Sequence, residues 1–246
     1  MADRPWVVGH RGFPVVAPEN TFASFEAAIA AGARMVEFDV TLTRDKVPVV
    51  FHDHTLDRTT NGKGAIPRKT LAEIRDLDAG SWFSPKFSAE RIPLFTDLLD
   101  RLGGRVQMNI EIKRDAVSLF PIRGIEAIVV EEVRKRNLQA GVIVSSFSPR
   151  TVRRVKKLAP ELETAILHAG PLNQDPGKFI TRARADAVHL SIRALDEAMV
   201  RRIQERKIPL RVYTVNEEDD IRRMANWGVD GIFSDQVARA LSLVRP

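Results

Sequence analysis

The chain has 246 residues, of which 44% are hydrophobic and 28% charged, and its formal net charge is +6. This length suits one large α/β domain with a well-buried core, and a basic surface tends to attract anions such as phosphate esters. Cysteine is absent, which excludes disulfides and thiolate metal sites, so any bound metal must use carboxylate, imidazole or carbonyl ligands.

The N-terminal segment, MADRPWVVGHRG, lacks the basic region, long apolar stretch and small-residue cleavage site of a signal peptide. No apolar run approaches the length of a membrane span. We therefore expect a cytoplasmic protein with no membrane span. Lysine and arginine form no block with interleaved aromatic residues, so no nucleic-acid partner is expected, and the oligomeric state stays open.

The first predicted strand begins near residue 6 and ends directly before His10 and Arg11. A loop follows, and Asn20 or Thr21 can cap the next helix. This order is the first part of a βαβ unit, which places His10 at the end of a strand. Glu19 and Asn20 are interpreted as structural residues.

Residues 35–62 hold an unusual density of ionisable side chains. Apolar residues alternate over residues 35–42 and recur over 47–51, and residues 44–46 lie between the two runs as a polar turn. Three residues cannot form a parallel crossover, which needs a dozen or more, so the two runs are predicted to form an antiparallel hairpin.

Acidic side chains lie inside these apolar runs, where buried strands normally avoid charge. Glu37 and Asp39 are two residues apart and so point to one face of their strand. If the turn centres near residues 44–45, His52 lies opposite Glu37 and Val50 opposite Asp39. An exposed hairpin with ordinary surface charge is the alternative, but we favour a convergence of two carboxylates and an imidazole.

Residues 55–93 are rich in Gly, Pro, Ser and Thr and contain one short helical pattern near 70–76. This composition predicts an insertion between barrel elements rather than a domain. Trp82, Phe83 and Phe87 lie close together within it. Such a cluster either lines a substrate pocket or holds the loop in place, and we favour the second.

The next strand, 106–113, places Glu111 and Lys113 on one face near its C-terminal end. A salt bridge at the strand rim is one explanation. We favour a third metal carboxylate beside a phosphate-binding cation. A long helix with an apolar stripe is predicted over 122–137.

The rest of the chain alternates regularly between strand and helix patterns. Ser148 and Pro149 are predicted to start one helix, and Asn216 to cap another that begins with four acidic residues. The predicted strands are 142–146, 164–168, 187–191, 210–215 and 230–234.

Without the hairpin partner, eight apolar strand runs are each followed by a helical pattern, beginning near residues 6, 35, 106, 142, 164, 187, 210 and 230. This predicts an α/β fold, a (β/α)₈ TIM barrel of one domain over 1–246, with a small insertion after the second barrel strand and its hairpin. An open doubly wound sheet is the alternative. Its dinucleotide-binding form would need a G-x-G-x-x-G turn after the first strand, which is absent.

Active sites of such barrels lie at the C-terminal ends of the strands. Three carboxylates without thiols form a hard oxygen site suited to Mg²⁺ or Ca²⁺. Two histidines can serve as general acid and general base, and two cations can stabilise an anionic phosphoryl group. The chemistry indicated is phosphodiester cleavage, by the candidate residues His10, Arg11, Glu37, Asp39, His52, Glu111 and Lys113.

The chain resembles the glycerophosphodiester phosphodiesterase family, of the bacterial cytoplasmic type, in a set of motifs that spans almost its whole length: HRG (10–12), APENT (17–21), EFDV (37–40), HDHTLDRTT (52–60), EIK (111–113), YTVN (213–216) and DGIFSD (230–235). The resemblance implies a barrel enzyme that hydrolyses glycerophosphodiesters to glycerol 3-phosphate and an alcohol with a divalent cation. In the family the glycerol hydroxyl next to the phosphate attacks first, and water then opens the cyclic phosphate.

The resemblance also implies a role for each candidate residue. Glu37, Asp39 and Glu111 would bind the metal. His10 and His52 would be the acid/base pair, without assignment of which is which, and Arg11 and Lys113 would hold phosphate.

Tyr213 stands where the family typically has Trp. If its ring lines the pocket, we expect the head-group preference to change and the chemistry to be retained. His54 could support the site. His168 and His189 end strands, so each either touches substrate or is structural, and we favour the structural role.

Two alternative functions remain: a metal-dependent barrel isomerase or lyase, and a catalytically silent phosphate-binding barrel. The leaving alcohol and the physiological metal also stay open.

Overall fold

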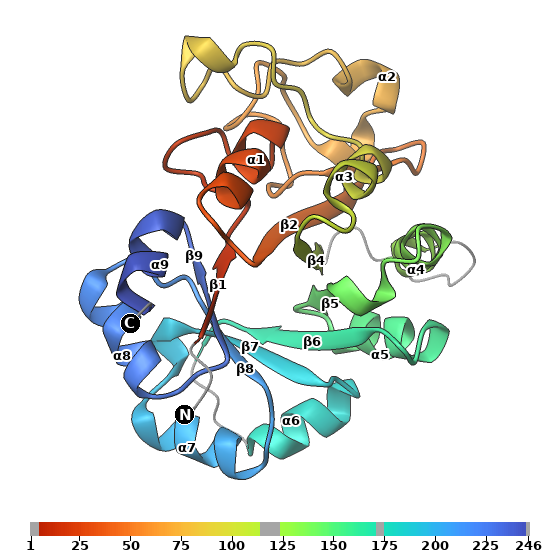
Figure 1. Cartoon of the computed structure of the whole chain (residues 1–246). Coiled ribbons are helices and arrows are strands. Elements are labelled where there is room, and N and C mark those ends of the chain that lie inside the picture. The colour runs from red at the N-terminus through yellow and green to blue at the C-terminus, as the bar shows by residue number, and fades with distance from the viewer. Residues whose placement is uncertain (1–4, 114–123, 171–174, 245–246) are drawn as a thin grey trace.

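A ring of parallel strands forms the centre of the molecule (Figure 1). The computed structural model describes residues 5–113, 124–170 and 175–244. Among these residues nine strands form one sheet, and all except β3 pair in parallel, with β9 returning to β1 to close the ring. The barrel strands are β1 (Trp6–Gly9), β2 (Met35–Leu42), β4 (Gln107–Ile112), β5 (Val142–Ser146), β6 (Glu163–His168), β7 (Ala187–Ser191), β8 (Leu210–Tyr213) and β9 (Gly231–Ser234).

Helices lie outside the ring and bury the main hydrophobic core between themselves and the strands (Figure 1). The strands are buried on both faces, which explains why apolar residues recur along each of them. The predicted TIM barrel is thus confirmed. The outer helices are α1 (Phe22–Ala30), α3 (Phe95–Leu102), α4 (Ile125–Lys135), α5 (Pro149–Leu158), α6 (Pro176–Ala183), α7 (Glu197–Glu205), α8 (Glu218–Asn226) and α9 (Val237–Val244).

Two predicted helix caps form in the structure, and a third predicted cap does not. The side chain of Thr21 accepts from the backbone N–H of Ser24 to cap α1, and Ser148 caps α5 in the same way. The predicted cap at Asn216 is wrong, because α8 begins after Glu217 and the Asn216 side chain bonds elsewhere. None of the helices in the described part of the chain is long and apolar enough to cross a bilayer.

The predicted hairpin forms, but its register differs by one residue from the prediction. β3 (Pro48–Val50) runs antiparallel to β2, with Val40 opposite Val50. The backbone N–H of Phe51 donates to the carbonyl of Asp39, so the predicted pairs of Glu37 with His52 and of Asp39 with Val50 are wrong.

The turn explains the difference. The loop consists of three residues, 44–46. The turn is therefore centred on residue 45 and not between residues 44 and 45, as the prediction assumed. The N–H of Lys46 donates to the carbonyl of Thr43, and Lys46 then adopts a left-handed conformation with φ 65°. A hydrogen-bonded turn followed by a left-handed residue is typical of three-residue hairpin loops, and it pairs Thr43 with Val47.

The predicted insertion, about residues 55–93, lies between β3 and α3 and has a small core of its own. It contains η1 (Ile66–Arg68), α2 (Leu71–Ile74) and η2 (Pro85–Phe87). Phe83 packs edge to face against Trp82 and Phe87, with ring centroids 5.8 and 5.6 Å away. These contacts support the interpretation that the aromatic cluster holds the loop in place.

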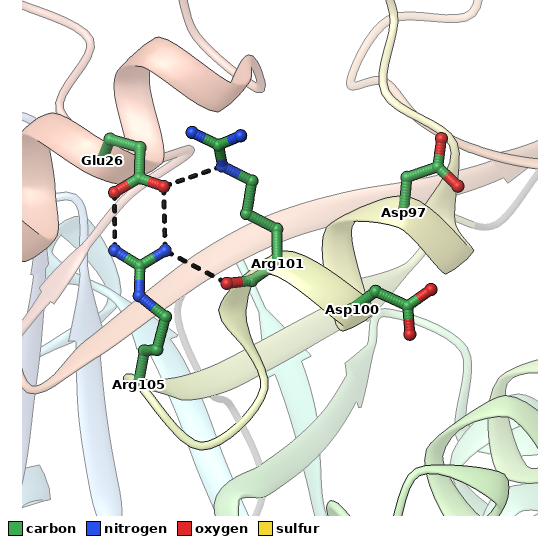
Figure 2. Close-up of a pocket in the computed structure, with 5 residues that line it drawn as sticks. All are labelled: Glu26, Asp97, Asp100, Arg101 and Arg105. Carbon is green, nitrogen blue, oxygen red and sulfur yellow. Dashed lines mark hydrogen bonds and ion pairs between the residues drawn. The ribbon is translucent and has the colours of Figure 1, made fainter.

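A shallow hollow on the outside of the barrel is lined by charged side chains of α1, α3 and the loop after α3 (Figure 2). Glu26 accepts from Arg101 Nε at 2.8 Å and from both terminal nitrogens of Arg105 at 2.8 and 2.9 Å. Arg105 precedes β4, so the hollow lies toward the end of the barrel where strands begin. Residues at that end of a TIM barrel usually contribute to stability rather than to catalysis.

Candidate active site

A cavity of about 190 Å³ opens among the C-terminal ends of the barrel strands. Its walls combine charged side chains from the first strands with aromatic side chains from the later ones. The lining residues are His10, Arg11, Glu37, His52, Asn109, Glu111, Lys113, Phe147, Leu167, Tyr213, Thr214 and Phe233. This is the position at which the sequence places the active site.

Three buried carboxylates lie at one side of the cavity. Asp39 on β2 is the register partner of Glu111 on β4, and Glu37 lies two residues before Asp39 on the same face. One oxygen of each lies within 4.8 Å of the others, and the residues are 3%, 1% and 8% exposed for Glu37, Asp39 and Glu111. Hard cations prefer such a set of oxygen ligands, so the donors fit a divalent metal.

The electrostatics of these acids point the same way. Burial, together with the neighbouring charges of Asp39 and Glu111, raises the pKa of Glu37. Burial also raises the pKa of Glu111, with Asp39 contributing. The Asp39 carboxyl is equally buried, but Lys113 and Arg11 hold its pKa below the usual range. Like charges confined this closely need cationic partners, and a metal ion would supply one.

Two cationic side chains lie against the carboxylates. Lys113 Nζ is 3.1 Å from Asp39 Oδ1 and 3.1 Å from Glu111 Oε1. Burial lowers the pKa of Lys113, but the two carboxylates outweigh it and raise the pKa overall. Arg11 donates to Glu19 at 2.9 Å, and its Nε lies 3.6 Å from Asp39.

His10 follows β1 and is held by a carboxylate from the far end of the chain. Its Nδ1 lies 2.7 Å from Asp235 Oδ1. The Asn216 side chain fixes Asp235, donating to Oδ2 at 2.7 Å and accepting from the Asp235 backbone N–H at 2.9 Å. The imidazole is thereby oriented with Nδ1 occupied.

His52 has a matching arrangement built on an arginine. Its Nδ1 lies 2.6 Å from Asp53 Oδ1. Arg58 donates twice to Asp53, at 2.6 and 3.1 Å, and twice to Glu19, at 2.7 and 2.7 Å. Hydrogen bonding to Arg58 lowers the pKa of Asp53 to about 2. Burial lowers the pKa of His52, and the nearby Asp39 carboxylate opposes this only in part.

The structure brings the seven candidate residues of the sequence together at this site, while their roles stay predictions. Sequence reasoning missed the residues that hold the histidines. It also gave Glu19 and Asn20 only structural roles, although Asn20 donates to Asp39 Oδ2 at 2.9 Å. The signal lay in the motifs themselves, since HDHTLDRTT, YTVN and DGIFSD contain the missed positions Asp53, Arg58, Asn216 and Asp235.

The remaining histidines are not among the described residues that line the cavity. His189 is fully buried in the barrel interior, where it packs against Phe233 with ring centroids 5.0 Å apart. His168 packs against Phe179 at 5.4 Å. Trp82, Phe83 and Phe87 do not line the cavity either.

Comparisons with known proteins agree with this geometry. A sequence model of the glycerophosphoryl diester phosphodiesterase family matches residues 10–239. A glycerophosphodiester phosphodiesterase of Caldanaerobacter subterraneus is 39% identical over 97% of this chain and 97% of its own. One of Bacillus subtilis is 34% identical over 95% of this chain and 84% of its own.

Solved structures give the same result. An Oleispira antarctica phosphodiesterase in complex with the product sn-glycerol-3-phosphate superposes with a TM-score of 0.88 at 30% identity, covering 98% of this chain and 97% of that one. A glycerophosphodiester phosphodiesterase of Agrobacterium tumefaciens superposes with a TM-score of 0.82 at 28% identity over 97% and 99%. The barrel, the cavity at its C-terminal rim and the match over residues 10–239 together show that this chain belongs to the glycerophosphoryl diester phosphodiesterase family.

Proposed function

We propose that the chain hydrolyses glycerophosphodiesters to glycerol 3-phosphate and an alcohol in the cavity at the C-terminal rim. One observation carries the proposal: a single small cavity joins a buried acidic cluster, two cationic side chains and two histidines that are each held by a carboxylate. The named activity of the relatives and the product bound to the Oleispira antarctica structure support the same substrate class.

His10 and His52 exchange the protons of the reaction in this proposal. Each imidazole has Nδ1 engaged by an aspartate, so Nε2 is the nitrogen left for the substrate. One histidine takes the proton of the attacking hydroxyl, and the other gives a proton to the leaving alcohol oxygen. General acid–base catalysis of this kind contributes about 10²–10⁴-fold in rate.

Arg11 and Lys113 hold the phosphate. Both project into the cavity and already face carboxylates, so their positions are fixed before substrate arrives. Charge-assisted bonds from them stabilise the extra negative charge that the phosphoryl group gains in the transition state.

Glu37, Asp39 and Glu111 would hold a divalent cation, Mg²⁺ or Ca²⁺. Such an ion supplies Lewis-acid stabilisation of negative charge on the substrate oxygens. Without it, Lys113 and Arg11 are the main cations among the described residues that balance the two buried acids beside Asp39.

The test is release of glycerol 3-phosphate from glycerophosphocholine, with and without a chelator. We expect release by the cation-loaded protein and its loss on chelation. No release with cation present would instead indicate the silent phosphate-binding barrel or an isomerase or lyase, and release unaffected by chelation would remove the metal from the mechanism.

A matched pair of variants sharpens this test. Glu111→Gln removes one proposed ligand and is expected to abolish the cation dependence along with most activity. Glu26→Gln removes an ion-paired carboxylate on the outside of the barrel, where Glu26 binds two arginines. This control variant should retain activity. An equal loss of activity in both variants would contradict the assignment of Glu111 as a metal ligand.

A further inference from the structure

The excess positive charge of the chain lies in one part of the fold. Residues 124–210, which include α4, α5, α6 and α7, contain 16 lysines and arginines and ten acidic residues. This excess equals the formal net charge of the whole chain, +6, so the remaining residues are balanced. The four helices follow one another around the outside of the barrel, each in contact with the next (Figure 1). The net charge therefore arises from one side of the molecule.

The exposed cations without a salt bridge on this side gather at the C-terminal ends of the four helices. Outer helices of a TIM barrel run opposite to the strands, so these ends lie where the strands begin, at the far end of the barrel from the active-site cavity. We call this set the basic rim; none of its members forms a salt bridge with another described residue. The basic rim consists of Lys135 of α4, Lys157 of α5, Arg182 and Arg184 at the end of α6, and Arg202 and Lys207 at the end of α7.

The helix dipole alone does not explain the basic rim. Cations in the last turn of a helix are stabilising at any helix, so this role would apply to all the outer helices alike. The other four differ: α1 and α9 have no basic residue in the last turn. Arg101 of α3 pairs with Glu26, and Arg223 of α8 pairs with Asp220. Half of this end of the barrel thus carries positive charge that the protein itself does not pair.

Acidic side chains on the same side do not neutralise the basic rim. Of the ten acids in residues 124–210, eight already bind an arginine, a lysine or a backbone N–H. Glu131 and Glu205 are the two that are exposed without such a partner in the described part of the chain. A positive field therefore extends from the rim, over about 10 Å at 0.1 M salt, and attracts an anionic surface.

One large apolar side chain is exposed beside these cations. Leu158, the last residue of α5, directly follows Lys157 and is 39% exposed. It borders a shallow groove between α4 and α5 that Val130 and Lys135 also line. Proteins that bind the surface of anionic bilayers combine the same elements, because the apolar group enters the interface while the cations meet lipid phosphates.

Nucleic acid is the other large anion that a basic surface could bind. Proteins that bind single strands stack bases on exposed aromatic rings. The aromatic residues of 124–210 are Phe147, which lines the active-site cavity, and Phe179, which is buried. Neither can stack on a base at the basic rim, and an exposed leucine adds nothing to phosphate contacts. These observations favour a lipid surface.

We propose that the basic rim, together with Leu158, docks the protein on an anionic bilayer surface. Docking in this way leaves the active-site cavity at the opposite end of the barrel, open to the solution. With the proposed function, the docked protein would hydrolyse soluble diesters close to a membrane and not lipids within it. That consequence rests on the proposed function, whereas the docking itself does not.

Vesicle sedimentation tests the docking. Wild type should bind vesicles of phosphatidylcholine with phosphatidylserine, should not bind phosphatidylcholine alone, and should dissociate as salt is raised. Lys157→Gln with Arg182→Gln should lower the partition coefficient about 25-fold, because each cation at the surface contributes about fivefold. Lys63→Gln with Arg75→Gln changes the net charge equally, but in the insertion, and should bind like wild type. Equal losses in the two double variants would contradict the proposal.

The apolar contact distinguishes a bilayer from nucleic acid. Leu158→Ser should weaken vesicle binding, because the leucine enters the interface, without changing the net charge of the protein. Tighter binding to a short DNA duplex than to anionic vesicles, with no effect of Leu158→Ser on either, would replace the lipid surface by a nucleic-acid partner. Binding to neither would show that the cations serve only the helix ends. Both results would overturn the proposal.

The orientation can be measured without turnover. Because the chain has no cysteine, a single one can be introduced and labelled with an environment-sensitive fluorophore. The label on Leu158→Cys should move to shorter emission wavelength on anionic vesicles. The label on Val15→Cys, which is 44% exposed in the loop after β1 at the cavity end, should not. A shift at Val15 would contradict the orientation, whereas a protein that docks as proposed but hydrolyses no diester would overturn only the proposed function.

Discussion

The two histidines of the site share one geometry but have different supports. His10 is held by Asp235, whose own partner is a neutral amide, whereas His52 is held by Asp53, whose partner is the charged Arg58. A carboxylate on Nδ1 fixes the tautomer and the ring orientation in both cases. The two imidazoles are therefore oriented before a substrate binds, which lowers the entropic part of the barrier.

At this scale we predict the outcome of removing either imidazole. His10→Ala and His52→Ala should each lower kcat by about 10²–10⁴-fold, because each loses one proton transfer. Steady-state rates of glycerol 3-phosphate release at saturating cation measure this, and thermal unfolding shows whether the fold is retained.

His54→Ala is the matched control for this prediction. His54 lies two residues from His52 on the same segment, but its side chain is exposed and outside the cavity lining. This variant should keep near-normal activity. Near-normal rates in His10→Ala or His52→Ala would remove that residue from the proton transfers, and a loss as large in His54→Ala would show a general effect on the segment.

The hairpin shows what residue patterns could predict of the site. Alternation placed Glu37 and Asp39 on one face of β2, because pairing with the neighbouring barrel strands fixes that face. The position of His52 could not be predicted in the same way. It lies beyond the end of β3, so its place depends on Asp53 and Arg58 rather than on the strand register that the turn sets.

Among the larger elements, the insertion contributes to the site through one residue, Arg58. Arg58 ties Asp53, which orients His52, to Glu19, which binds Arg11. Its planar guanidinium makes two bonds to each carboxylate, a geometry that lysine cannot reproduce.

Replacing Arg58 should therefore impair both groups at once. Arg58→Gln and Arg58→Lys should each lower kcat/KM by about tenfold or more, since each loses paired charge-assisted bonds of roughly 1.5–3 kcal/mol. In an Asp53→Asn background the same change should cost less than in wild type, because the part of the effect that acts through Asp53 is already lost and only the bonds to Glu19 remain.

Arg75→Gln is the control for this prediction. Arg75 belongs to the same insertion but pairs only loosely with Asp76, at 3.9 Å on the surface, so its loss should leave kcat/KM unchanged. If Arg58→Lys retains full activity, the bidentate geometry is unimportant. Independent, additive losses in the double variant would also contradict the coupling.

The ion-pair network of α1 and α3 offers an element-scale prediction about stability (Figure 2). Hydrogen bonding to Arg105 lowers the pKa of Glu26 to about 2. A carboxylate with a depressed pKa stabilises the fold above its ordinary value near 4.5, and this contribution is lost as pH falls through about 2. Because Arg101 and Arg105 are about half exposed, solvent screens the network.

Glu26→Gln should thus lower the free energy of unfolding at pH 7 by at most about 1 kcal/mol. The difference from wild type should shrink at pH 3.5 and in 1 M salt, as urea unfolding at each condition would show. A difference that stays constant with both pH and salt would mean that the Glu26 side chain acts by packing and not by charge.

Strands were easier to predict than the ends of helices for a physical reason. Barrel strands are buried on both faces, so apolar residues mark their positions even where polar residues such as Glu37 and Glu111 interrupt them. Asn216 looked like a helix cap because the acidic residues after it suit a helix start. Its side chain instead bonds Asp235, a partner 19 residues away that no local pattern indicates.

At the scale of the whole molecule, closure of the barrel assembles the site. His10 and Asp235 are 225 residues apart in sequence and meet because β9 pairs with β1. The alternation of strands and helices was enough to predict this closure, and with it the meeting of strand ends. It could not predict that Asn216 and Asp235, which follow the last two strands, hold His10, because no spacing links these motif residues to the start of the chain.

Folding of the sheet also creates the acidic cluster. Glu37, Asp39 and Glu111 come together only when β2 and β4 are paired, so the unfolded chain has no equivalent site. A cation that binds the cluster therefore stabilises the folded state by mass action. At a concentration 100 times its dissociation constant, it adds about 2.7 kcal/mol to the free energy of unfolding.

For a domain of this size that gain corresponds to an increase of roughly 5–10 °C in the melting temperature. We expect Mg²⁺ or Ca²⁺ to produce it and a chelator to reverse it, as measured by calorimetry. Glu111→Gln should show a much smaller shift, while Glu26→Gln should respond like wild type because its carboxylate is not part of the cluster. An equal shift in both variants would place the cation elsewhere on the surface, and no shift in wild type would mean that Lys113 and Arg11 alone balance the buried acids.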